Sequence, residues 1–433
     1  MDSAQYKYLR NCKYYLCIIG LWPYQTFLQK FLVRIIFIPI IAAQVILQGG
    51  GLVAASVASD TECFLEGFAP FIISLMCLAK YINFIYNYDQ MKRLFDIMQE
   101  DWKIYKKFDK EYDNIRQQYA EGNRIVTNFG GLLFGMITPF AGMSCILNAA
   151  DALGLYNLNG ERPLTFRIEH FVDVDKYYYI LLVHSYIGTI AYAAIVVAVD
   201  SVIIIFVIHE CGLCEILRYK LENCVETDSM DIDLHPDKQE DMWYQNAKSC
   251  VKLHKHIIEF ADIIENANTM SYFFQLGFNM ICVSFTQFQA IVHLSVPNQA
   301  LQYISLTISL LCDLLFVSWP GQRLIDYTER IFEHTTNNKW YQSSINTRTL
   351  LRIMLLKSMT TPKLTACKIY TLNMENFSTI RASTRDKSHS FTKFDTTRRQ
   401  FLGISFTGLL LRNTTSGTEV SNPPNRETNA NEH

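Results

Sequence analysis

Residues 266–312 read NANTMSYFFQLGFNMICVSFTQFQAIVHLSVPNQALQYISLTISLLC and contain no Asp, Glu, Lys or Arg. A helix crosses the roughly 30 Å hydrocarbon core of a bilayer in about 20 residues, and a charged side chain within that distance is costly. The run is therefore long enough for two membrane spans. Pro297 and Asn298 interrupt the apolar residues, and we expect the turn between the two spans there.

Similar runs occur in other parts of the chain. A weaker candidate span, residues 63–86, carries Glu66 near one end and Lys80 near the other. We expect the Lys80 side chain to reach toward the headgroups, because a long charged side chain near a helix end can snorkel. Three further stretches lack charged residues altogether, at 35–59, 125–150 and 177–199.

These runs predict an all-α fold, that of a polytopic membrane protein with seven transmembrane helices. Continuous apolar runs fit helices and not the alternating pattern of barrel strands. Of the 433 residues, 50% are hydrophobic and 18% are charged, against roughly 25% charged in an average soluble domain. The net charge of −2 gives no basic field for a nucleic-acid partner. Within residues 34–319 the expected spans are about 34–58, 63–86, 125–149, 178–205, 268–294 and 299–319, and the seventh begins near residue 365.

Lysine and arginine are concentrated on one side of the expected spans. The segments that share a side with the N-terminus hold 25 of them, whereas the opposite loops hold three, Arg162, Arg167 and Lys176. Cytoplasmic loops of membrane proteins carry the excess of Lys and Arg, so we expect the N-terminal segment 1–33 to be cytoplasmic. G-protein-coupled receptors have the opposite orientation.

The expected cytoplasmic connections are long, and some show apolar residues at helical spacing. Gln90–Tyr119 and Asp241–Glu265 are two such stretches. This periodicity predicts amphipathic helices rather than flexible charged loops. We therefore expect the membrane helices to continue into the cytosol and to pack against one another there.

Five short motifs follow one another along the chain, namely GLWP, FVSWPGQRLI, NKWY, LLRIM and KLTACKIYTLNMENFSTI. These motifs and their order resemble those of insect odorant receptors. The longest, Lys363–Ile380, is similar to the last-helix signature of that family, and the resemblance covers about residues 8–380. The related gustatory receptors carry a different last-helix pattern, TY followed by apolar residues and QF, which is absent here. The motifs are GLWP at Gly20–Pro23, FVSWPGQRLI at Phe316–Ile325, NKWY at Asn338–Tyr341, LLRIM at Leu350–Met354 and KLTACKIYTLNMENFSTI at Lys363–Ile380.

The resemblance implies a ligand-gated, non-selective cation channel in the plasma membrane of olfactory sensory neurons. An odorant-tuned subunit of this family assembles with a shared co-receptor into a heterotetramer around a central pore, without a cofactor. The cytoplasmic parts of the later spans form an anchor region, which here would include residues 320–364. The last helix, beginning within residues 365–380, would line the pore.

That last segment supplies candidate residues for pore lining or subunit contact. Lys368 and Glu375 would either flank the ion path or form ion pairs between subunits, and the sequence leaves both readings open. The candidates are Lys368, Tyr370, Leu372, Met374, Glu375 and Phe377.

A pocket for a small apolar odorant needs apolar walls, a suitable shape and one or two polar atoms. We expect it in the outer halves of the spans, where aromatic residues are frequent. The alternative for each residue is helix packing or lipid contact. The candidate ligand-binding residues are Phe64, Phe68, Phe71, Phe140, Met143, Tyr178, Tyr179, Ser185, Tyr186 and Tyr303, with Phe288 as a further aromatic wall.

Asp200 and Asp313 place carboxylates within two of the expected spans. A charge inside a membrane segment is either functional or paired with another group. Both residues fall toward the cytoplasmic ends of their spans, and we expect structural ion pairs there.

The cysteines do not form a recognisable metal motif. Cys211 and Cys214 form a lone CxxC without a second pair at zinc-ribbon spacing, so we expect no metal site there. Cys63 and Cys145 both fall near the expected outer face, and the sequence leaves open whether they are bridged. No nucleophile elbow, phosphate loop or HExxH motif occurs, so we expect no enzymatic activity.

The sequence departs from the family after Ile380. In odorant receptors the last helix continues through an apolar stretch of about 15 to 20 residues, enough to complete a span. Here a charged and then Ser/Thr-rich sequence follows, and we expect residues 381–433 to be a disordered tail. Either an incorrect gene model at the 3′ end or a truncated, non-conducting isoform would account for it.

The two alternative functions for a polytopic helical chain of this kind are a G-protein-coupled receptor and a small-molecule transporter. A G-protein-coupled receptor is expected to carry an acidic-Arg-aromatic triplet at the inner end of its third span and NPxxY in its last span. A small-molecule transporter commonly shows inverted repeats and paired broken helices. Neither pattern is evident in this sequence.

Overall fold

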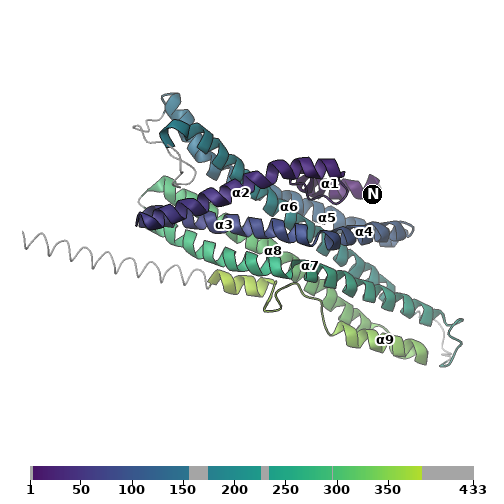
Figure 1. The fold of residues 1–433 in the computed structure, drawn as a ribbon. Helices are drawn as coiled ribbons and strands as arrows, with labels where there is room; N and C mark the ends of the chain where they lie inside the picture. Colours follow the sequence, from purple (N-terminus) through teal and green to yellow (C-terminus); the bar gives the residue numbers. More distant parts are fainter. Residues whose placement is uncertain (1–2, 156–173, 226–233, 295, 383–433) are drawn as a thin grey trace, which may run out of the picture.

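The computed structural model describes residues 3–155, 174–225, 234–294 and 296–382 (Figure 1). Almost every described residue outside the connections is helical, which confirms the predicted all-α class. A final helical segment covers residues 374–382. In chain order the elements are α1 (Ser3–Ile18), α2 (Phe27–Val57), α3 (Thr61–Tyr86), α4 (Tyr88–Tyr105), α5 (Asp109–Ala152), α6 (Val174–Glu222), α7 (Met242–Val292), α8 (Pro297–Asn337), the 3₁₀ turn η1 (Trp340–Gln342), α9 (Ile345–Ser358), β1 (Thr365–Ala366) and β2 (Tyr370–Thr371).

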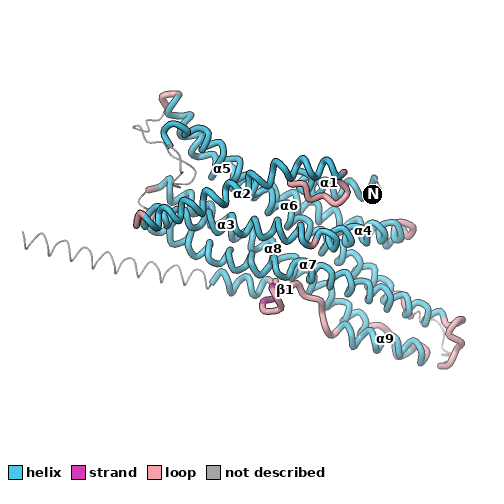
Figure 2. The backbone as a smooth tube through the Cα atoms, viewed as in Figure 1, coloured by secondary structure: helices cyan, strands magenta, loops and turns pink. Residues whose placement is uncertain are grey.

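The long helices run side by side in an elongated bundle (Figures 1 and 2). The connections from α2 to α3 and from α7 to α8 lie at one end of this bundle, which we call the turn end. The short helices α1, α4 and α9 lie toward the opposite end, which we call the α9 end (Figure 1). The bundle therefore has two ends of different construction.

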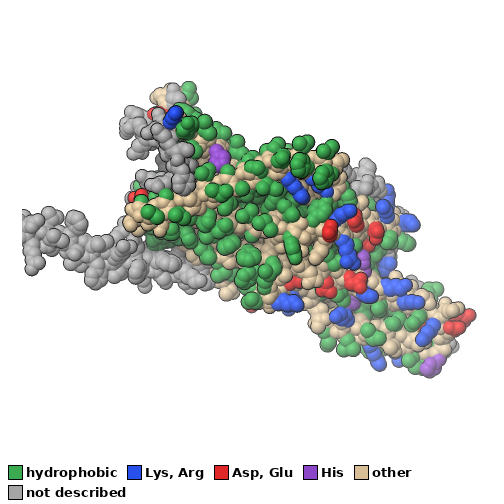
Figure 3. Space-filling model, in the orientation of Figure 1, with side chains coloured by type: hydrophobic (Ala, Val, Ile, Leu, Met, Phe, Trp, Pro, Cys, Tyr) green, Lys and Arg blue, Asp and Glu red, His purple; other side chains and the backbone are tan. Residues whose placement is uncertain are grey.

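Four helices among the described residues are long and apolar enough to cross a membrane: α2, α3, Lys176–Glu222 within α6, and Gln299–Gln342, which begins within α8. The surface of α2 shows the same property, because Phe27 and Val57 are more than 80% exposed. Apolar side chains cover much of the bundle in Figure 3, whereas Lys and Arg side chains gather over the α9 end. An apolar surface of this extent fits contact with lipid rather than water.

The centre of the bundle is α6, which packs against α5, α7 and α8 and also touches α2 and α3. Its apolar stretch is the most hydrophobic of those in the four helices, and 89% of that stretch is buried inside the protein. A helix that is apolar on all sides is expected to be enclosed by others. The most hydrophobic of these four helices thus lies in the core of the bundle and not on its lipid-facing surface.

Side-chain caps define where several helices begin. Thr26 and Gln29 form a reciprocal capping box at the start of α2, and the Asp60 carboxylate accepts from two backbone N–H groups at the start of α3. Asp241 accepts from the Tyr244 N–H at the start of α7 at 2.9 Å. Such caps satisfy N–H groups that the helix itself leaves without partners.

The prediction of a helix beginning near residue 365 is wrong for residues 365–373. Thr365 pairs with Thr371 in an antiparallel two-strand hairpin, and helical structure begins only at residue 374. Cys367 and Lys368 at the tip have φ angles of 52° and 60°, which a right-handed helix does not allow. Two successive positive φ angles are the signature of a tight hairpin turn.

The hairpin is fixed to α7 by hydrogen bonds. The Glu265 carboxylate accepts from the Thr365 backbone N–H at 2.7 Å and also from the Thr365 hydroxyl. The Thr269 hydroxyl accepts from the Cys367 backbone N–H at 2.8 Å. These side chains supply acceptors for backbone N–H groups of the hairpin, which would otherwise lack partners, and they hold the hairpin against α7.

Candidate ligand pocket and buried charge cluster

A cavity lies inside the bundle, between α2, α3, α5, α6 and α8. It measures about 80 Å³, several times the roughly 10–15 Å³ that one water molecule needs. Its walls are mainly apolar, as expected of a site for a small organic ligand. The apolar lining includes Ile73, Met76, Leu133, Ile137, Val196, Leu306 and Leu310, and the polar lining residues are Gln48, Thr189, Tyr192, Ser309 and Asp313.

Two polar atoms of the lining residues lack a hydrogen bond among the described residues. They are Oε1 of Gln48 and the phenol oxygen of Tyr192, which has the Ser74 hydroxyl as a polar neighbour. Ser309, by contrast, donates its hydroxyl to the Ser305 carbonyl at 2.9 Å. A buried polar group without a partner is costly, so a ligand hydroxyl or carbonyl that pairs with these atoms would bind favourably.

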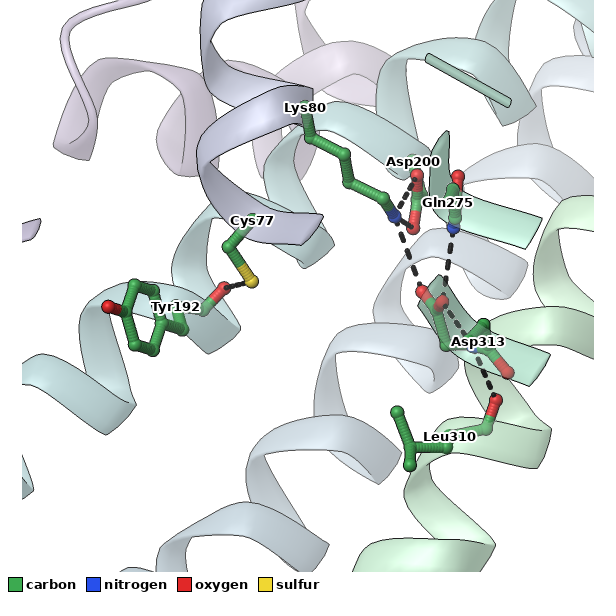
Figure 4. Close-up of polar contacts among 8 residues, drawn as sticks. Cys77, Lys80, Tyr192, Asp200, Gln275, Leu310 and Asp313 are labelled. Carbon is green, nitrogen blue, oxygen red and sulfur yellow. Dashed lines mark hydrogen bonds and ion pairs between the residues drawn. The ribbon is translucent and has the colours of Figure 1, made fainter. Parts of the chain in front are cut away.

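A buried ion cluster adjoins the cavity through Asp313 (Figure 4). The Lys80 ammonium lies 2.7 Å and 2.9 Å from the two oxygens of Asp200 and 3.3 Å from Asp313 Oδ1. The Lys80 side chain is only 1% exposed. The prediction that Lys80 snorkels is therefore wrong, because α6 and α8 surround it with carboxylates that compensate its charge.

Amide side chains from α7 complete the cluster. Gln275 and Asn279 each donate to Asp313 Oδ2 at 3.1 Å, and Asn279 also donates to the Leu310 carbonyl at 3.1 Å. The cluster thus joins α3, α6, α7 and α8 through groups buried away from water. The predicted structural pairing of Asp200 and Asp313 is confirmed, with Lys80 as the shared partner that the sequence analysis did not identify.

The predicted ligand-binding residues do not line this cavity. Phe64 packs against Phe68, which also packs against Phe285 of α7 with ring centroids 5.1 Å apart. Ser185 is buried, and its carbonyl accepts from the Thr189 hydroxyl at 2.8 Å. These contacts are helix packing, which was the alternative to ligand binding for each of these residues.

The other predicted residues are distributed over several helices. Tyr178 is buried and accepts from the Asn148 amide at 2.6 Å, whereas its neighbour Tyr179 is 72% exposed. Tyr303 packs beside His293. The remaining members are Phe71, whose ring lies close to Gly49, Tyr186, near Gly142, Phe288, which is half-buried, and Phe140 and Met143, whose side chains lie outside the described residues.

The candidate pore residues divide between the hairpin and the following helix. Lys368 is exposed at the hairpin tip, so its placement on a helix is wrong. Leu372 is fully buried, and its backbone lies against Gly321 of α8. Tyr370 lies in β2 and is half-buried. Met374 lies at the start of the following helix, and its backbone N–H donates to the Gln322 side chain at 3.2 Å. Glu375 is exposed, and Phe377 is half-buried against the core.

A second polar cluster lies toward the α9 end and was not predicted. The buried Asp101 carboxylate of α4 contacts His209 Nε2 at 3.0 Å and His256 Nε2 at 2.9 Å. Burial alone raises the pKa of Asp101, but the hydrogen bonds to both imidazoles outweigh it and lower that pKa to about 2. The hydrogen bond to Asp101 raises the pKa of His256. The cluster ties α4 to α6 and α7.

Two pairs of cysteines stood out in the sequence, Cys211 with Cys214 and Cys63 with Cys145. Cys211 and Cys214 are buried in α6. Whether Cys63 and Cys145 are bridged stays open, because the Cys145 side chain lies outside the described residues. The potential metal ligands that do converge within the described residues are carboxylates and an imidazole at the turn end, Glu62, Glu66 and His293.

Comparison with known proteins identifies both a family and a fold. The family model described as 7tm Odorant receptor matches residues 60–384. The structure of insect olfactory receptor OR5 from Machilis hrabei in complex with eugenol superposes with a TM-score of 0.72 at 11% identity, covering 91% of this chain and 100% of that one. A second structure of that receptor gives 0.69 at 12% identity, with coverages of 90% and 99%. A search of curated protein sequences finds no match.

Proposed function

The chain belongs to the 7tm odorant receptor family, and from this premise we propose that it is an odorant-tuned subunit of a heteromeric, odorant-gated cation channel. The observation that carries the proposal is the cavity bounded by α2, α3, α5, α6 and α8. Its apolar walls suit a small volatile molecule, and its polar groups, among them the unpaired Oε1 of Gln48, provide discrimination between ligands. The proposed role is not enzymatic and needs no cofactor.

The proposed membrane arrangement has seven spans and a cytoplasmic N-terminus. Six spans are assigned to α2, α3, α5, α6, α7 and α8, and the seventh would begin in the helical segment 374–382. The α9 end then faces the cytosol, in agreement with the Lys and Arg side chains gathered there (Figure 3). The turn end faces outward, at the plasma membrane of an olfactory sensory neuron.

The proposed partner is a co-receptor subunit, in a heterotetramer. The support comes from α9 and its C-cap residue Met359, which lie at the proposed cytosolic end. Ile353 and Leu356 of α9 are 56% and 67% exposed there, and Met359 is 65% exposed. Apolar side chains exposed outside the lipid are typical of protein contacts. On α7, Phe273 and Met270 are also exposed, close to the hairpin that precedes the proposed pore helix.

The odorant is proposed to bind in the cavity. The aromatic residues nearer the turn end, such as Phe68 and Tyr303, are proposed to form the outer part of the same pathway. Odorant specificity would then depend on Tyr192 and Gln48 as hydrogen-bonding groups and on the aliphatic residues as the shape-determining wall.

The experiment is whole-cell recording from cells that express the chain with the family's co-receptor. We expect odorant-evoked cation current from the pair and none from this chain alone. An N-terminal epitope tag should be accessible to antibody only after permeabilisation. Silence across a broad odorant panel, in cells where the chain reaches the surface, would contradict the channel role, and a tag accessible on intact cells would contradict the orientation.

A further inference from the structure

Three potential metal ligands converge at the turn end of the bundle. Glu62 and Glu66 lie one helical turn apart on α3, so their side chains share one face of that helix. His293 is the C-cap residue of α7. The ligating atoms of the three side chains all lie within 4.8 Å of one another. They come from two helices whose ends meet beside the α7–α8 connection.

The hydrogen bonding of His293 prepares its ring for a metal. Its Nδ1 lies 3.0 Å from the Gln289 carbonyl oxygen. A carbonyl oxygen can only accept, so Nδ1 carries a proton, and in the neutral ring Nε2 is the nitrogen that can ligate a metal. Metal-binding histidines usually donate one ring N–H to a carbonyl or carboxylate in this manner, which fixes both the tautomer and the ring orientation.

The ring is further held by an aromatic neighbour. Tyr303, near the start of α8, lies beside His293 with ring centroids 5.5 Å apart. Glu62 is exposed, whereas Glu66 and His293 are half-buried. The site therefore combines two partly enclosed ligands with one that is free to move inward from solvent, so that an ion can enter.

We propose that Glu62, Glu66 and His293 form a binding site for Zn²⁺ or a similar transition-metal ion. One imidazole with two carboxylates is a ligand set typical of zinc, which binds nitrogen at about 2.0–2.1 Å and carboxylate oxygen at about 2.0–2.2 Å. Ca²⁺ and Mg²⁺ prefer oxygen ligands alone and a higher coordination number. Three protein ligands leave a fourth tetrahedral position for water.

Closing the site requires only a small adjustment. Ligands at zinc distances lie about 3.4 Å apart in a tetrahedron, as follows from the bond lengths. The ligating atoms lie within 4.8 Å of one another, so each pair must approach by at most about 1.4 Å to reach the zinc geometry. The exposed Glu62 side chain can supply this movement by changing rotamer. No backbone change is needed.

A bound ion would link the helices that bound the cavity. It would join α3, which contributes Ile73 and Met76 to the cavity wall, to the end of α7. The α7 helix is in turn joined to α8 by the hydrogen bond from the Thr307 hydroxyl to Thr286 at 2.8 Å. The ion would therefore restrain the turn end, and its binding does not depend on the proposed odorant function.

The test is a zinc titration of the purified full-length chain in detergent after removal of metals with a chelator. We expect the midpoint of thermal unfolding to rise with Zn²⁺ and to saturate, because an ion that binds the folded state stabilises it. Ca²⁺ and Mg²⁺ at the same concentrations should produce a much smaller shift. The variants His293→Ala and Glu66→Gln should weaken the apparent zinc affinity at least about tenfold.

The control variants are His235→Ala and Glu240→Gln, which remove the same groups from an exposed connection and should leave the titration unchanged. Glu62→Gln changes an exposed side chain and guards against loss of folding in the other variants. Zinc content after gel filtration gives a second measure, with about one ion fewer per chain in His293→Ala. Equal zinc shifts and equal zinc content in wild type and His293→Ala would overturn the site, and an equal response to Ca²⁺ would overturn the assignment to transition metals.

Discussion

Replacing Lys80 by Met should destabilise the protein more than any single surface change. The ammonium compensates two carboxylates whose side chains are only 7% and 5% exposed, those of Asp200 and Asp313. Removing one partner of a buried ion pair leaves an uncompensated charge and costs about 3–5 kcal/mol. This corresponds to a factor of roughly a hundred to several thousand in the folding equilibrium. The assay is the free energy of unfolding by a denaturing detergent.

A second substitution distinguishes the charge effect from loss of packing. Asp313 keeps the two amide donors Gln275 and Asn279 in any case. The double variant Lys80→Met/Asp200→Asn therefore leaves one carboxylate that is still hydrogen-bonded, and it should recover more than half of the lost stability. Lys92→Met, on the exposed face of α4, is the matched control. A Lys80→Met protein within about 1 kcal/mol of wild type, or no recovery in the double variant, would refute the reasoning.

Two further predictions concern the hairpin and the second polar cluster. A methyl group on Gly321 would lie 2.1 Å from the Leu372 carbonyl oxygen, so Gly321→Ala should lower the unfolding free energy by about 1–3 kcal/mol. Gly277→Ala, whose methyl group meets nothing within 4 Å, should leave it unchanged. Equal stabilities of the two variants would contradict the close packing at Gly321. The pKa of Asp101 is lowered to about 2, so its stabilisation is present above its usual pKa near 3.8 and is lost as pH falls toward 2. The pKa of His256 is raised, so its contribution is complete below pH 6.5 and is lost at higher pH. The unfolding free energy of wild type should therefore fall from pH 6 to pH 8, and that of Asp101→Asn should fall less. Identical pH profiles of the two proteins would exclude the cluster as the cause.

The long apolar helices could be predicted from the sequence because the cost of charge in lipid acts on each segment separately. The apolar stretches within α2 and α8 are examples, because their low content of charged residues can be seen in the sequence itself. The prediction that Lys80 reaches toward the headgroups was wrong, because its two carboxylate partners lie 120 and 233 residues away in the sequence. A single run cannot reveal which distant helix supplies the opposite charge.

The hairpin and the cavity were missed for different physical reasons. The hairpin depends on Cys367 and Lys368 in a left-handed conformation and on Glu265 as an outside partner, and neither residue type at its tip marks such a turn. The ligand-binding candidates were chosen by residue type and depth in the membrane. Which residues face a cavity, such as Ile137 or Thr189, depends on the rotation of each helix about its axis, and this is fixed only by packing.

The most direct test of the account is to fill the cavity and record odorant-evoked current in cells that also express the co-receptor. Ile137 of α5 lines the cavity, whereas Ile146 on the same helix is 59% exposed. We expect Ile137→Trp to raise the half-maximal odorant concentration at least about tenfold, since an overfilled site loses about 1–3 kcal/mol, and Ile146→Trp to leave it unchanged. Equal odorant sensitivity of Ile137→Trp and wild type would show that the odorant does not bind in this cavity.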